Sequence, residues 1–218
     1  MLVFFSLQCN KTYRIYNINI FLNIKSKMRI QLKTVLFVAN LLLAVSFASN
    51  AQTLKINPKL SSITILGTTN VHDYETKVTQ INAEVVLSGS NQVQSMVLSI
   101  PVKSIKSKEK LMDTKTYEAF NSETYPTISF KMTEVNSFQL TNTDVLVAVT
   151  GNLTMNGTTK KITLKPAGKV LKSGVYEFKG ALALKMTDFK MKPPTAMMGM
   201  MKVGDGITLK YSVVFEVQ

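Results

Sequence analysis

Few side chains in this sequence could carry catalytic chemistry. His72 is the only histidine and Cys9 the only cysteine. A Ser–His–Asp triad needs an aspartate that converges on the histidine, but Asp73 is adjacent to His72, and neighbouring side chains on a strand point to opposite faces. We therefore predict no catalytic residues and no enzymatic activity. For His72, a hydrogen-bonded structural role and a contact to a ligand head group both stay open.

Methionine is the other residue type with distinctive chemistry here. Six methionines fall within 16 residues, at Met186, Met191, Met197, Met198, Met200 and Met201. Thioethers are soft ligands that can bind Cu(I). Methionine is also an adaptable filler of apolar cavities and binding surfaces. We predict no metal site and expect these side chains to line a core or to form a lid, with a Cu(I)-binding or stress-response protein as the alternative.

The beginning of the chain is typical of an export signal. Arg29 and Lys33 follow Met28, residues 34–47 are almost wholly apolar, and Ser49-Asn50-Ala51 places small residues before a cleavage point. We expect 28–51 to be a signal peptide and 1–27 an upstream extension from a misassigned start, with an uncleaved membrane anchor as the alternative. Cleavage after Ala51 would yield a periplasmic or secreted domain, 52–218, without cysteine or disulfide.

The charge of that domain favours no nucleic-acid partner. Of the 26 basic residues in the chain, six lie in residues 1–51, which leaves 20 lysines against 13 acidic residues and a net charge near +7. The lysines are scattered along the sequence, whereas nucleic-acid binders concentrate Arg and Lys on one face. We interpret them as a solvated cationic surface, with transient contact to anionic membranes as a secondary expectation. The oligomeric state, monomer or homodimer, stays open.

The elements that must position these residues are mostly strands, because apolar residues alternate with polar ones from Gln52 onward. The clearest run is the last, with Ile207, Leu209, Tyr211, Val213, Phe215 and Val217 on one face. Asn156-Gly157, Ser173-Gly174 and residues 88–91 predict tight turns. The pattern predicts an all-β fold of about eight antiparallel strands, an up-and-down barrel or a sandwich. Residues 104–120 predict a short helical insertion with Leu111, Met112 and Ala119 on one face, and 187–206 a long irregular loop.

Two segments resemble the YceI-like family: YEAFNSETYPTISF over residues 117–130 and GNLTMNGTTK over residues 151–160. His72 resembles the family's early histidine, although Tyr74 stands where the family often has Phe, and the glycine that follows is missing. The resemblance implies a lipocalin-like barrel around a long apolar tunnel. It also implies that the occupant is a polyisoprenoid-type lipid, such as an isoprenoid quinone.

Alternation alone does not distinguish a hollow barrel from a packed one, since both bury every second residue. With the resemblance, we expect a carrier or sequestering protein for an isoprenoid-like or other long-chain lipid, with no cofactor besides that lipid. An interaction module with a solid core is a weaker alternative. The predicted ligand-binding residues, near the irregular segments, are His72, Tyr74, Met112, Phe120, Tyr125, Phe130, Phe189, Met197 and Met198.

Overall fold

The structure is a computed structural model that describes residues 52–88 and 92–217. The predicted upstream extension and signal peptide lie outside the described residues. In the described part, no helix is both long and apolar enough to cross a membrane.

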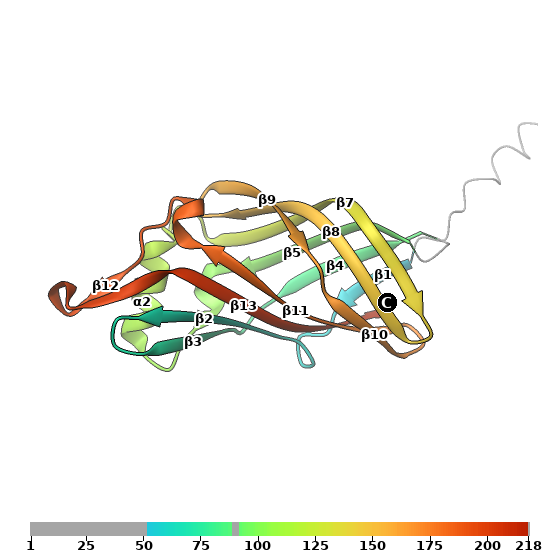
Figure 1. Cartoon of the computed structure of the whole chain (residues 1–218), viewed down its shortest axis with the longest axis horizontal. Helices are drawn as coiled ribbons and strands as arrows, with labels where there is room; N and C mark the ends of the chain where they lie inside the picture. The colour runs from blue at the N-terminus through green and yellow to red at the C-terminus, as the bar shows by residue number, and fades with distance from the viewer. Residues whose placement is uncertain (1–51, 89–91, 218) are drawn as a thin grey trace, which may run out of the picture. The chain divides into compact units, whose positions relative to one another are not determined.

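Eight antiparallel strands form a closed barrel, as the alternation predicted (Figure 1). The ring closes because β1 pairs with β4 on one side and with β13 on the other. In ring order the strands are β1 (Gln52–Ile56), β4 (Asn82–Leu87), β5 (Val93–Pro101), β7 (Thr127–Thr141), β8 (Asp144–Met155), β10 (Ala167–Lys172), β11 (Val175–Lys185) and β13 (Met201–Val217).

Two long strands change partners along their length. The last residues of β13, Phe215–Val217, pair with β1, whereas Val203–Ser212 pair with β2 (Ser62–Thr69). Strand β2 continues the sheet through β3 (Asp73–Val78) to β6 (Ile105–Lys106). Likewise β8 pairs with β10 at residues 144–146 and with β9 (Thr158–Leu164) at residues 149–155. The wall is therefore longer than the ring of eight strands alone.

Short irregular elements lie at the end of the barrel away from the C-terminus (Figure 1). They are the 3-10 turns η1 (Val102–Ser104), η2 (Met186–Phe189) and η3 (Met197–Gly199), the helix α2 (Lys110–Ala119) and the short strand β12 (Thr195–Ala196). The predicted helical insertion is confirmed but shorter than residues 104–120. Of the predicted helix face, Ala119 packs against the core, whereas Leu111 is more than half exposed.

The predicted irregular stretch 187–206 is wrong in its second half. Strand β13 begins at Met201, and its pairing with β2 shifts register between Val203 and Ile207. Residues 204–206 read Gly-Asp-Gly, so this irregular part of the strand carries no alternating apolar signal.

Two of the predicted turns are confirmed. Asn156 and Gly157 join β8 to β9 with φ angles of 47° and 67°, the left-handed pair that a two-residue hairpin needs. Ser173 and Gly174 join β10 to β11, and Gly174 has a φ of 75°. The third predicted turn, 88–91, includes residues outside the described part, but the strands on either side of it pair antiparallel.

Candidate ligand-binding cavity

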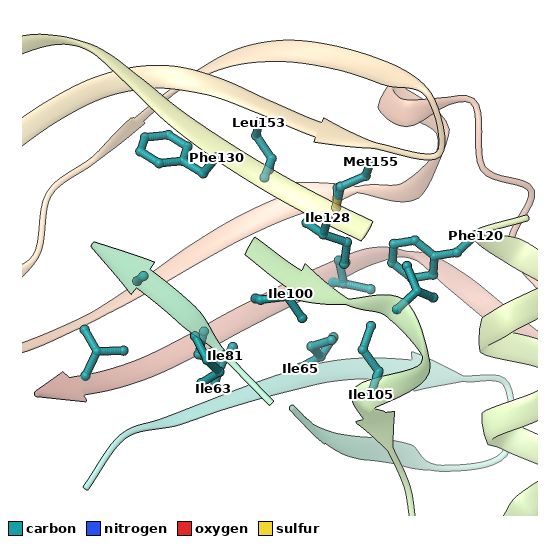
Figure 2. Packing of buried hydrophobic residues seen from close by; sticks show 14 of the residues in the cluster. Ile63, Ile65, Ile81, Ile100, Ile105, Phe120, Ile128, Phe130, Leu153 and Met155 are labelled. Carbon is teal, nitrogen blue, oxygen red and sulfur yellow. The ribbon is translucent and has the colours of Figure 1, made fainter. Parts of the chain in front are cut away.

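A cavity of about 170 Å³ lies inside the barrel, and its wall is apolar. The inward residues of nearly every strand contribute, as the labelled side chains of β2, β5, β7 and β8 show by pointing into a shared interior (Figure 2). The barrel is therefore hollow over part of its core. Among the residues that line it are Ile63, Ile65, Leu98, Ile100, Phe120, Ile128, Phe130, Leu153, Met155, Phe178, Leu182, Ile207, Leu209, Tyr211, Val213 and Phe215.

The cavity is long compared with its width. Every second residue of β13 from Ile207 to Phe215 lines it, and eight residue steps of a strand span about 27 Å along the strand direction. Strands in a barrel are tilted, so the length along the axis is somewhat shorter. An elongated apolar chain fits such a space better than a compact molecule does.

Glycines on the inner face let aromatic rings lie along the wall. A side chain at Gly151 of β8 would overlap the ring of Phe130, and one at Gly180 of β11 would overlap the hydroxyl end of Tyr211. The two rings therefore occupy the space above these glycines and do not project straight across the bore. Phe178 meets Phe215 edge to face with ring centroids 6.2 Å apart, which fixes a third part of the aromatic wall.

The interior carries no charge. Lining residues in the described part include no Asp, Glu, Lys, Arg or His, and the one hydroxyl among them belongs to Tyr211. Burial raises the pKa of Tyr211, so its phenol is uncharged at neutral pH. Within the described residues, that hydroxyl makes no hydrogen bond. It lies beside Gly180 of β11, against the barrel wall, and the surface that the cavity presents is apolar.

A buried asparagine closes the wall beside helix α2. The amide nitrogen of Asn156 donates to the carbonyl oxygens of Phe189 and Lys190, at 3.1 and 3.2 Å, and its amide oxygen accepts from Asn121 at 2.7 Å. Three segments distant in sequence, the β8–β9 turn, η2 and the end of α2, are thus tied together. Both polar atoms of this buried side chain have partners, as a buried amide requires.

The predicted ligand-binding phenylalanines lie at or behind the cavity wall. Phe120, directly after α2, and Phe130, on β7, both line the cavity. Phe189 is almost completely buried in the surrounding core and is not part of the lining. The structure therefore brings these three residues to one interior but gives Phe189 a supporting position.

Three other predicted residues lie outside the cavity. Tyr74 on β3 covers Gly67 of β2, and Tyr125 covers Gly157 of the β8–β9 turn. Burial raises the pKa of Tyr74. Met112 lines a small separate groove between α2 and the β12–β13 hairpin.

The remaining predicted residues, His72, Met197 and Met198, are exposed at the α2 end of the barrel. His72 lies in the β2–β3 turn, where its backbone N–H donates to the Thr69 hydroxyl at 3.0 Å. Met197 and Met198 form the turn η3. None of the three lines the cavity.

Sequence reasoning missed several lining residues, notably Phe178, Leu182, Tyr211 and Phe215. All four stand on the alternating apolar faces of β11 and β13, so the signal for a wall position was present. Nothing in the alternation distinguishes a wall residue from a packed core residue, and we therefore favoured the irregular segments. As for metals, the described residues hold no group of three or more His, Cys, Asp or Glu side chains that could bind an ion.

Comparison with known proteins identifies a family and similar solved structures. A family model described as a YceI-like domain matches residues 54–215. The fold is similar to BcnA of Burkholderia cenocepacia, with a TM-score of 0.57, 20% identity and 73% of this chain and 98% of that chain covered. A search of curated proteins found no match.

Two further solved structures share the fold. A polyisoprenoid binding domain from Saccharophagus degradans, implicated in plant cell wall breakdown, superposes with a TM-score of 0.58 at 11% identity, over 76% of this chain and 98% of that one. A YCEI protein of Campylobacter jejuni superposes with a TM-score of 0.50 at 19% identity, over 66% of this chain and 84% of that one.

Proposed function

Since the chain belongs to the YceI-like family, we propose that it carries or sequesters an isoprenoid-like or other long-chain lipid inside its barrel. The observation that carries the proposal is the long cavity, whose wall is apolar. The resemblance to a solved polyisoprenoid binding domain supports the same ligand class. No catalytic step is part of the proposed function.

Burial of hydrocarbon drives binding in this proposal. Each methylene group moved from water to the cavity contributes at most about 0.8 kcal/mol, so ten carbons would contribute up to roughly 8 kcal/mol before the cost of ordering the ligand. Charged head groups are disfavoured inside, because a wall without charged groups offers no partner for them.

We also propose that the protein acts after export, with cleavage behind Ala51. Expression of the full chain in a bacterial host should give a periplasmic product whose intact mass begins at Gln52. A cytoplasmic product that retains residues 28–51 would contradict this proposal.

Native mass spectrometry with lipid extraction tests the ligand class. We expect the protein purified from the periplasm to carry a species of isoprenoid or other long-chain lipid mass, near one per chain. A ligand-free mass that stays unchanged after incubation with quinones and polyprenols would overturn the proposal.

A matched pair of substitutions locates the binding site. Leu182→Trp adds a large side chain to the cavity wall, whereas Leu146→Trp makes the same change at an exposed position on β8. We expect the first to lower lipid affinity at least about tenfold, equivalent to about 1.4 kcal/mol, and the second to leave it unchanged. Phe130→Asp, in a protein shown to remain folded, should abolish uptake. Equal binding by all three variants would place the lipid outside the barrel.

Cu(I) binding is a second candidate because of one long-range contact. The side chain of Asn70 donates to the carbonyl oxygen of Met200 at 2.9 Å, which brings the turn that holds His72 beside the exposed methionines. Replacing Met197, Met198, Met200 and Met201 with Leu should abolish Cu(I) binding and preserve lipid binding. Cu(I) affinity that survives this replacement would exclude the site.

A further inference from the structure

The β12–β13 hairpin ends in three exposed methionines, Met197, Met198 and Met200, which we call the methionine tip. They expose 60%, 106% and 72% of their reference surface. Figure 1 shows the turn after β12 beyond helix α2, at the end of the barrel opposite the C-terminus. None of the three lines the cavity, so the tip has no part in the wall.

The backbone of the tip makes the choice of methionine unusual. Met197 and Met198 have φ angles of 52° and 53°, in the left-handed region that favours Gly and Asn. An unbranched apolar side chain at these positions adds backbone strain. Met198 buries no surface within the described structure, and Met197 is more than half exposed. Folding stability therefore does not explain these two residues, whereas a contact made by their side chains would.

Further apolar side chains gather beside the tip. Asn70 donates to the carbonyl of Met200 and accepts from the backbone N–H of Lys202 at 2.8 Å, so the β2–β3 turn is clamped to the hairpin. The next residue of that turn, Val71, is exposed. Leu111 of α2 is also exposed and faces Ala196 across the small groove between the helix and the hairpin. The apolar tip thus has apolar neighbours from two other elements.

Three lysines stand close in the sequence to these apolar residues. Lys110, Lys192 and Lys202 are exposed, and none forms an ion pair with another described residue. Two carboxylates, Glu109 beside the groove and Asp73 after the turn, lie in the same region. An exposed apolar centre with a cationic border is the arrangement that binds the interface of an anionic bilayer, where apolar groups enter the acyl boundary and lysines meet the head groups.

We propose that the methionine tip docks the barrel onto anionic lipid bilayers. Flexible thioether side chains suit a fluid surface because they adapt to it without a fixed complementary shape. Docking of this kind deepens the proposed function, since a lipid carrier has to meet a membrane. Vesicle binding nevertheless needs no occupied cavity, so the two proposals can fail separately.

Vesicle sedimentation tests the docking surface. The exported protein is incubated with phosphatidylglycerol–phosphatidylcholine vesicles and with phosphatidylcholine vesicles, both without isoprenoid lipid. We expect binding to the anionic vesicles that weakens as salt is raised, because salt screens the lysines. The triple variant Met197→Ser, Met198→Ser, Met200→Ser should bind at least about tenfold more weakly.

Matched control variants show whether vesicle binding depends on the methionine tip itself. Leu140→Ser, Leu146→Ser, Leu171→Ser removes three exposed apolar side chains from β7, β8 and β10 and should leave vesicle binding unchanged. Leucine at the three tip positions should also preserve vesicle binding, although it would abolish Cu(I) binding. Circular dichroism and a thermal unfolding midpoint close to that of the unchanged protein show that the barrel of the serine variant is intact. Absence of binding to anionic vesicles, or equal losses in the tip and leucine-to-serine variants, would overturn the docking proposal and leave the cavity proposal untouched.

Discussion

Two groups of methionines, with five residues between them in the chain, have opposite environments. Met186 begins the turn η2, Met191 follows it, and both are buried in the core, whereas the methionine tip is exposed. Turn η2 is fixed by hydrogen bonds from Asn156 to its last carbonyl and from Thr187 to Asp205. The tip is held at its base, by Asn70 and by the pairing of β12 with β13. Methionine content therefore indicates neither a core nor a binding surface; the anchoring of the backbone decides between them.

The largest expected effect contrasts one methionine from each group. Met186→Ala should lower the free energy of unfolding by about 2–5 kcal/mol, because it removes a buried side chain and leaves a cavity. Met198→Ala should change it by less than about 0.5 kcal/mol, since no buried contact is lost. Chemical denaturation of both variants measures the difference. Similar losses in the two would mean that the tip is packed in solution.

The anchors of the two segments give the next contrast. Asn156→Ala should cost about 1–3 kcal/mol, because its three hydrogen bonds are lost and buried partner groups stay unsatisfied. Asn70→Ala exposes its former partners to water and should cost less, about 0.5–1 kcal/mol. Hydrogen exchange should become faster around residues 189–190 in the first variant and around residues 200–202 in the second. A larger loss for Asn70→Ala would reverse the proposed order of anchoring.

A smaller effect should distinguish the contribution of Met198 to folding stability from its contribution to vesicle binding. Met198→Gly relieves a left-handed methionine and should stabilise the fold by about 0.5 kcal/mol, after the entropy that glycine adds to the unfolded chain. The same change removes an apolar side chain from the tip and should weaken vesicle binding. Thermal unfolding and sedimentation measured together check the opposite signs, and a loss in both would indicate a structural role for this side chain.

The smallest effect is a pH dependence at the base of η2. Hydrogen bonds from the backbone and side chain of Thr187 lower the pKa of Asp205 below its ordinary value of 3.8. Its contribution to stability is therefore fully present above about pH 4 and is lost as the pH falls through the lowered pKa. Asp205→Asn should reduce the loss of stability below pH 4, with Asp188→Asn as a control from the same turn. Identical acid profiles for the two variants would dismiss this role.

Much of the barrel could be predicted because its signals are local. Alternation marked Val213 and Phe215 as inward, and Asn156-Gly157 marked a two-residue turn. The change of partner along β13, from β2 to β1, could not be predicted, because the same alternating pattern is compatible with either partner strand. Nor could the contact of Asn70 with Met200, 130 residues away, be foreseen. The sequence likewise does not show that Tyr211 and Phe178 line the cavity, because alternation does not indicate which inward residues border empty space.

The glycines beneath Phe130 and Tyr211 bear on how the bore of such barrels can vary. Strand number and tilt fix the diameter of the backbone ring. The free width inside the ring, however, depends on whether each aromatic side chain can lie along the wall over a glycine, as at Gly151 and Gly180. Exchange of such a glycine for alanine would tip the ring toward the lumen and narrow the passage locally. The free width of the barrel interior can therefore change through a single methyl group while the ring of strands stays the same.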